Sequence, residues 1–270
     1  MRAIPRFFER RVRLYSFTAV SLVLVGTPAR ADQELELLGE NATTETPARA
    51  AHFLPGALDA EMDSATTAVG AGWAGYDGAT KNPVASATAE AWVVPRLSLT
   101  AGFGSTTQPG EVRLRAQGGV RVMLLDQRRF GVNAAVGFLY RQDRFANEEG
   151  MLEWSALLSR RFGATLAMAN FVYAQDGEGD DREGELRVVG LHDFGTHLHL
   201  GLDGRVRTSL GSSDPHRLEH SNPTFEFNAG PLLAYSMGRF SLVSEAGISG
   251  QKVDRLRTGV LVLGGLAAAF

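Results

Sequence analysis

Arginine and histidine residues recur at every second position in two segments of the chain. In the segment 111–125, Arg113, Arg115 and Arg121 alternate with apolar residues. The segment 196–208 carries a second such row, made of His197, His199, Asp203, Arg205 and Arg207. Alternate residues of a β-strand point to the same face, and rows of cationic side chains along a narrow passage attract anions. These two rows therefore predict the lining of a channel.

Acidic residues follow the same alternation and offset much of this positive charge. Glu183 and Glu185 precede Arg187 on the segment next to the second row, so cross-strand ion pairs are expected there. The full set of expected pore-lining residues is Arg113, Arg115, Arg121, Arg141, Glu153, Glu185, His197, His199, Asp203, Arg205, Arg207, Glu226 and Glu245. The pattern leaves two interiors open: a narrow channel without strong charge selectivity, or a lumen filled by side chains and salt bridges.

Other residues that could carry catalysis or bind a metal do not meet the geometric requirements. His220 and Ser221 are adjacent, so in a strand they would point to opposite faces, whereas a serine nucleophile needs its base within hydrogen-bond reach. His197 and His199 have no third metal ligand at a fixed spacing, and the acidic segment 176–181 lacks the closing glutamate of a calcium loop. The chain has no cysteine, which excludes thiol catalysis. We therefore predict no enzyme, no metal site and no cofactor.

The alternation that positions these residues begins near residue 66 and continues to the C-terminus. A period of two indicates β-strands rather than helices. The expected strands are 66–77, 84–94, 97–107, 111–125, 130–143, 150–160, 164–175, 183–194, 196–209, 223–236, 239–251 and 258–270. Short turns alternate with longer polar loops between them, which predicts neighbouring antiparallel strands in up-and-down order.

Two architectures fit this alternation, and they differ in which face meets water. A soluble secreted sandwich or lipocalin-like binder turns its apolar face inward, whereas a transmembrane barrel turns it toward lipid. The expected strands have about 11–14 residues, against about 5–6 in soluble sheets and about 9–11 needed to cross a bilayer. The tetrapeptide at 128–131, Arg-Arg-Phe-Gly, recurs at 160–163, which would place arginine and phenylalanine repeatedly at one membrane interface. We therefore expect a transmembrane β-barrel of about twelve strands.

The first 65 residues differ in composition from the rest. Residues 1–31 combine a basic start, a short apolar run and the motif Ala-Arg-Ala, which predicts a secretory signal peptide cleaved after Ala31. Its removal changes the formal charge from −3 to −8, and nothing in this balance is typical of a nucleic-acid-binding protein. Residues 32–65 are acidic and poor in apolar residues, so we expect a periplasmic leader, with a plug inside the barrel as the alternative.

The last strand, 258–270, is apolar on one face and ends in Phe270. This ending resembles the assembly signal of bacterial outer-membrane β-barrel proteins. The resemblance implies an all-β barrel over 66–270 with short periplasmic turns and longer extracellular loops. It also implies contact with outer-membrane lipid and lipopolysaccharide, and assembly by the outer-membrane machinery through the C-terminal strand. We predict a passive pore for small solutes; the alternatives are a structural or surface-interaction barrel with a filled lumen and, less favoured, a lipid hydrolase built on His220 and Ser221.

Overall fold

The computed structural model describes residues 54, 58–61, 68–108, 111–142, 150–177, 181–212 and 224–270, all of which belong to one compact unit. The expected signal peptide 1–31 with its cleavage site, most of the leader 32–65, and the pair His220 and Ser221 lie outside these residues. The side chain of Arg113 also lies outside them.

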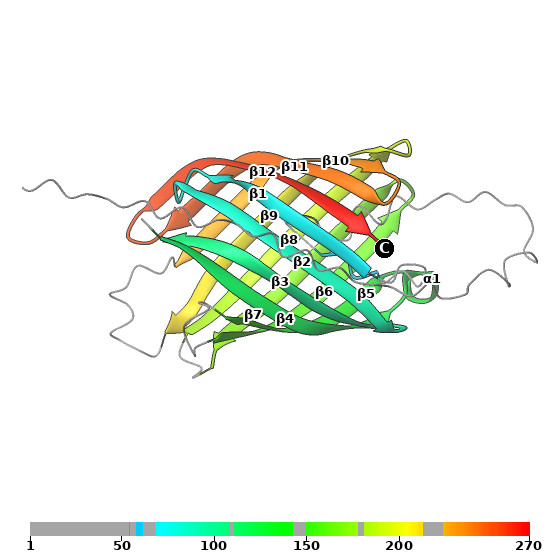
Figure 1. Cartoon of the computed structure of the whole chain (residues 1–270), viewed down its shortest axis with the longest axis horizontal. Helices are drawn as coiled ribbons and strands as arrows, with labels where there is room; N and C mark the ends of the chain where they lie inside the picture. Colours follow the sequence, from blue (N-terminus) through cyan, green and yellow to red (C-terminus); the bar gives the residue numbers. More distant parts are fainter. Residues whose placement is uncertain are drawn as a thin grey trace, which may run out of the picture. The chain divides into compact units, whose positions relative to one another are not determined.

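Twelve β-strands make up nearly all of the described chain (Figure 1). They are β1 Ala68–Asp77, β2 Asn82–Val94, β3 Leu97–Gln108, β4 Glu111–Leu125, β5 Asn133–Gln142, β6 Gly150–Phe162, β7 Thr165–Asp176, β8 Asp181–Phe194, β9 Leu198–Ser212, β10 Phe225–Met237, β11 Phe240–Lys252 and β12 Leu256–Ala269. The expected all-β fold and strand number are confirmed, with boundaries that differ by a few residues.

One boundary differs because a helical turn precedes β5. The strand expected over 130–143 begins at Asn133, since Gln127–Phe130 form the short helix α1. The Asp126 side chain accepts a hydrogen bond from the backbone N–H of Arg128, and Gly131 ends the turn with a φ of 77°, a conformation that favours glycine. Among the described residues, no helix is long and apolar enough to cross a membrane.

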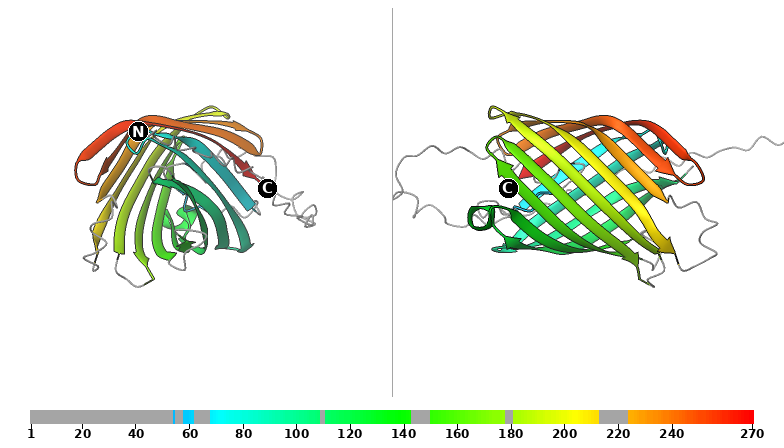
Figure 2. Two further views of the ribbon diagram at one scale, coloured as in Figure 1. Left: turned by 60° about the vertical axis from the view of Figure 1, so that its left-hand side comes forward. Right: turned by 180° about the vertical axis from the view of Figure 1, so that it is seen from behind.

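The strands form a closed antiparallel barrel in which each strand pairs with its neighbours in sequence. Closure occurs where β1 pairs with β12, in a register that places Trp73 opposite Gly265. The backbone N–H of Phe270 donates to the carbonyl of Ala68 at 2.8 Å, so the last residue extends this seam. Both views of Figure 2 show the strands tilted in the same sense around the barrel. The up-and-down topology is thus confirmed.

The outer wall is apolar, as a lipid-facing surface requires. Leu202 and Val260 are 69% and 63% exposed, which contradicts a soluble barrel with its apolar face inward. Phe138, Trp154 and Tyr173 stack across β5, β6 and β7, with ring centroids 5.7 and 5.8 Å apart. Aromatic belts of this kind mark the membrane–water interface.

The end of the barrel that carries the short turns (the turn end) has its own aromatic boundary. The Arg160 guanidinium lies 4.5 Å from the centre of the Phe162 ring, and Arg129 lies 5.3 Å from that of Phe130. Both pairs come from the repeated Arg-Arg-Phe-Gly motif, at the turns before β5 and β7. We call the opposite end of the barrel, which carries the longer connections, the loop end.

Candidate functional site

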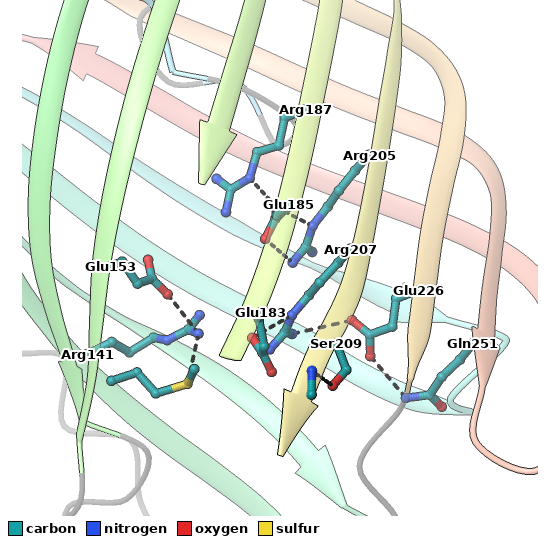
Figure 3. A network of polar contacts seen from close by, with 12 residues as sticks. Arg141, Glu153, Glu183, Glu185, Arg187, Arg205, Arg207, Ser209, Glu226 and Gln251 are labelled. Atoms are coloured by element: carbon teal, nitrogen blue, oxygen red, sulfur yellow. Dashed lines mark hydrogen bonds and ion pairs between the residues drawn. The ribbon is translucent and has the colours of Figure 1, made fainter. Parts of the chain in front are cut away.

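Charged residues line the inner wall toward the loop end and form what we call the charge belt (Figure 3). The belt consists of Arg141, Glu153, Glu183, Glu185, Arg187, Arg205, Arg207 and Glu226. Four arginines and four glutamates give a formal charge of zero. The belt contains six of the thirteen residues expected to line a pore, but each has an opposite charge beside it. Paired charges of both signs do not form an anion-selective row.

The ion pairs of the belt run from strand to strand. Glu185 accepts from Arg205 at 2.6 and 3.1 Å and also pairs with Arg187 on its own strand. Two residues further along β9 toward the loop end, Arg207 donates to Glu183 and lies 3.4 Å from Glu226. The cross-strand pairs between β8 and β9 agree with the expectation from the sequence.

The remaining two residues of the belt form a separate ion pair. Arg141 on β5 lies 2.7 Å from Glu153 on β6, and both side chains are mostly buried. Arg115 lies half-buried on β4, on the same face as Arg121. The sequence alternation thus placed these residues on the inner wall, although the partner of each cation depends on register.

Two carboxylates below the belt have no hydrogen-bond partner within the described chain. Asp203 is 4% and Glu245 1% exposed, and none of their four oxygens is bonded there. They interact electrostatically with each other and with Arg205. Asp203 pairs in register with Gly230 of β10. A Cβ added to Gly247 of β11 would lie 2.7 Å from the Cα of Gly230. The two glycines therefore leave no side chain between the carboxylates.

An apolar layer, the apolar girdle, covers the inner wall nearer the turn end. It consists of Leu166, Met168, Val189, Leu191, Leu232, Ala234 and Val243, and Leu54 of the leader packs into it. Alternation alone does not predict this layer, because it assigns the apolar residues of each strand to the outer face. The available signal was the segment 164–175, in which both faces are apolar.

Several predicted pore-lining residues lie below the girdle rather than in an open passage. Arg121 is 2% exposed and pairs with Glu90 of β2. His199 is 1% exposed and lies at the start of β9. His197 is not on the same face: it lies in the exposed turn before β9, beside the ring of Tyr235. The predicted second row therefore loses its first member, because the strand begins only at Leu198.

His199 forms a hydrogen-bonded chain with an acid and a serine. Its Nδ1 lies 2.8 Å from Asp193 Oδ1, and its Nε2 lies 3.0 Å from Ser236 Oγ. Arg161 holds the same aspartate at 2.6 Å. An Nδ1–H donating to the carboxylate leaves Nε2 to accept from the serine hydroxyl, which is the connectivity of a serine-hydrolase triad. No sequence motif indicates this group, because its members lie on three different strands, β8, β9 and β10.

The comparisons with known proteins support the fold. No family model and no curated protein matches the chain. Among solved structures, the NanC porin has 9% identity and a TM-score of 0.55 over 74% of this chain and 100% of that chain. The KdgM porin, solved in complex with disordered oligogalacturonate, has 8% identity and a TM-score of 0.53 over 75% of this chain and 99% of that chain. The protein therefore has the fold of bacterial outer-membrane porins.

Proposed function

We propose that this protein is an outer-membrane channel for small polar solutes. The observation that carries the proposal is the charge belt inside a closed barrel whose outer wall is apolar. Charged side chains in a membrane-spanning segment are retained where they line a passage or a functional site. The belt is electrically balanced, so we expect solutes of either sign to pass without strong charge selectivity.

The remaining sequence predictions fit this proposal. We propose that the chain is exported by residues 1–31 and cleaved after Ala31. Phe270 is 62% exposed at the end of the seam, where the outer-membrane assembly machinery could bind the last strand. The apolar outer wall would contact outer-membrane lipid and lipopolysaccharide.

Single-channel recording with two neutralising variants tests whether the belt lines a conducting passage. Arg207→Gln leaves Glu183 and Glu226 without their shared cation, so we expect the reversal potential to shift toward cations. Glu226→Gln removes one of those two acids and should shift it the opposite way. In a tenfold KCl gradient, where full selectivity gives about 59 mV, we expect shifts on the order of 10 mV.

These two variants control for each other, because each removes one charge, of opposite sign, from the Arg207–Glu226 pair. Both should keep the heat-modifiable gel migration of a closed barrel. Conductance with no selectivity change in either variant would remove the belt from the passage. No conductance in the wild type, in Leu54→Ser or in Asp59→Ala would favour the alternative in which side chains fill the lumen.

The group Asp193–His199–Ser236 supplies a second candidate function, acyl-ester hydrolysis. Against it, the backbone N–H of Ser236 already donates to the carbonyl of His197 at 2.8 Å, so this amide is not available to stabilise an oxyanion. We expect Ser236→Ala to destabilise the barrel by about 1 kcal/mol through the lost hydrogen bond, and the wild type not to react with a fluorophosphonate. Labelling that disappears in Ser236→Ala would instead establish a hydrolase.

A further inference from the structure

Two short pieces of the leader, Leu54 and Leu58–Glu61, lie against the inner wall of the barrel. Asp59 is 2% exposed and Ala60 is fully buried. Leu58 packs against two apolar clusters, one from β1 and β12 and the other formed by Ala60 with Ala135 and Leu157. Ala135 and Leu157 lie far from Ala60 in sequence, so local chain geometry does not impose the contacts of the second cluster.

Polar groups of the wall recognise Asp59 twice. Arg121 donates from Nη1 to the backbone carbonyl of Asp59, and the Ser159 hydroxyl donates to its side-chain carboxylate. The charge of Arg121 is already balanced by Glu90, at 2.6 Å. Glu90 therefore orients the guanidinium, and its Nη1 donates to the peptide carbonyl of the leader. We call Arg121, Ser159, Ala135 and Leu157 the leader seat.

Leu54 makes the second attachment, in the apolar girdle. Its side chain is 6% exposed among girdle residues from β7, β8, β10 and β11. A leucine buried in this way gains about 1.5–3 kcal/mol relative to an exposed one. A girdle that is emptied of this leucine would present an apolar constriction to water, the kind of surface at which channels open and close by wetting.

We propose that the leader seat and the girdle form a binding site for the chain's own Leu54 and Leu58–Glu61, and that this contact closes the channel. The inference rests on the channel function proposed above. The ligand is a peptide segment with an aspartate between apolar residues, bound through one carbonyl, one carboxylate and two leucines. Loss of either attachment opens the passage from the turn end to the charge belt.

Recordings from the complete mature chain in planar bilayers test this closure. We expect Leu54→Ser and Asp59→Ala each to raise the open probability about tenfold, since each removes an attachment worth a factor of this order. Asp59→Asn is the matched control, because it keeps an oxygen for Ser159 and leaves the backbone carbonyl unchanged. It should stay close to the wild type. Wild-type conductance that is fully open and unchanged in Leu54→Ser and Asp59→Ala would overturn the closure.

A cross-link tests the contact without relying on conductance. The chain has no cysteine, so Ala60→Cys combined with Ala135→Cys introduces one thiol pair within a single buried cluster. We expect a short thiol-reactive cross-linker to join them in the folded barrel and to hold the channel closed. The control pairs Ala60→Cys with Ala246→Cys, which lies on the exposed outer face of β11 and should not react.

The two failures give different results. If the Ala60–Ala135 pair does not cross-link in a barrel that is shown to be folded, the leader does not occupy the seat, whatever the barrel conducts. If the pair does cross-link but neither the uncross-linked chain nor Asp59→Ala conducts, the seat exists and the proposed channel function fails.

Discussion

Glu90→Ala is expected to destabilise the barrel by about 3–5 kcal/mol, the cost of leaving a buried charge without its partner. The Glu90 side chain is fully buried and accepts from Arg121 Nε at 2.8 Å and Nη2 at 2.6 Å. The Ser98 hydroxyl also donates to it. Its removal would take from the Arg121 guanidinium, 3% exposed, the acid that lies 2.6 Å from it.

Guanidinium unfolding of the refolded chain measures this effect through tryptophan fluorescence. Trp92 is a local reporter, because it lies two residues from Glu90 on the same strand face and packs against Val69 and Ala71. Glu90→Gln is the control: it keeps an acceptor oxygen for Arg121 and should lose less stability. A loss below about 1 kcal/mol in Glu90→Ala would show that another group or water neutralises the arginine.

A double variant separates the stability role of Arg121 from its role in the seat. Adding Arg121→Met to Glu90→Ala removes the buried cation as well as its acid, so part of the lost stability should return. The same variant lacks the donor that holds the carbonyl of Asp59. We therefore expect a barrel that is more stable than Glu90→Ala alone and yet open.

The strand order was predictable from the sequence because a period of two is a local property. Each inward position of β8, from Glu183 to Arg187, follows from the one before it, and a meander leaves no choice of neighbour. The ion pairs were predictable only as a class. Whether Arg207 bonds Glu183 or Glu185 depends on a register that shifts near Arg182 and Glu183, and turn chemistry does not reveal that shift.

The girdle and the leader seat were not predictable in the same way. In the sequence, an inward leucine such as Leu191 is an isolated exception in an otherwise polar row. Only the folded barrel shows that it packs in one cluster with Leu166 and Leu232 from other strands. The bond between Asp59 and Ser159 joins residues 100 positions apart. A composition that is acidic and poor in apolar residues predicted a leader or a plug, and it contained no information on which leader residue would be bound.

Gly265→Ala is expected to weaken closure of the barrel, whereas Gly264→Ala is not. A Cβ at residue 265 would lie 2.0 Å from Cε3 of Trp73 and 2.4 Å from the carbonyl oxygen of Gly72. A Cβ at residue 264 would meet nothing within 4 Å. The two glycines are adjacent on β12 and pair with the same strand. Each variant therefore adds one methyl group, and the two variants differ only in the face of the strand that carries it.

Overpacking of this kind costs about 1–3 kcal/mol, and here it falls on the β1–β12 seam. Boiled and unboiled samples run side by side on a gel separate closed from open barrels. We expect a smaller closed fraction in Gly265→Ala than in the wild type. Gly264→Ala should match the wild type or gain up to about 1 kcal/mol from a less flexible unfolded chain. Equal behaviour of the two variants would mean that Trp73 does not occupy the lumen opposite Gly265.

The same variant connects the seam to the proposed closure. Trp73 packs against both the girdle and the β1–β12 cluster that Leu58 contacts. A ring displaced from Gly265 is expected to change its packing against those residues, because it already contacts both clusters. Gly265→Ala should therefore disturb the binding of the leader even in the barrels that close, and the closed fraction should conduct more than the wild type. If that fraction conducts like the wild type, Trp73 does not link the seam to the leader.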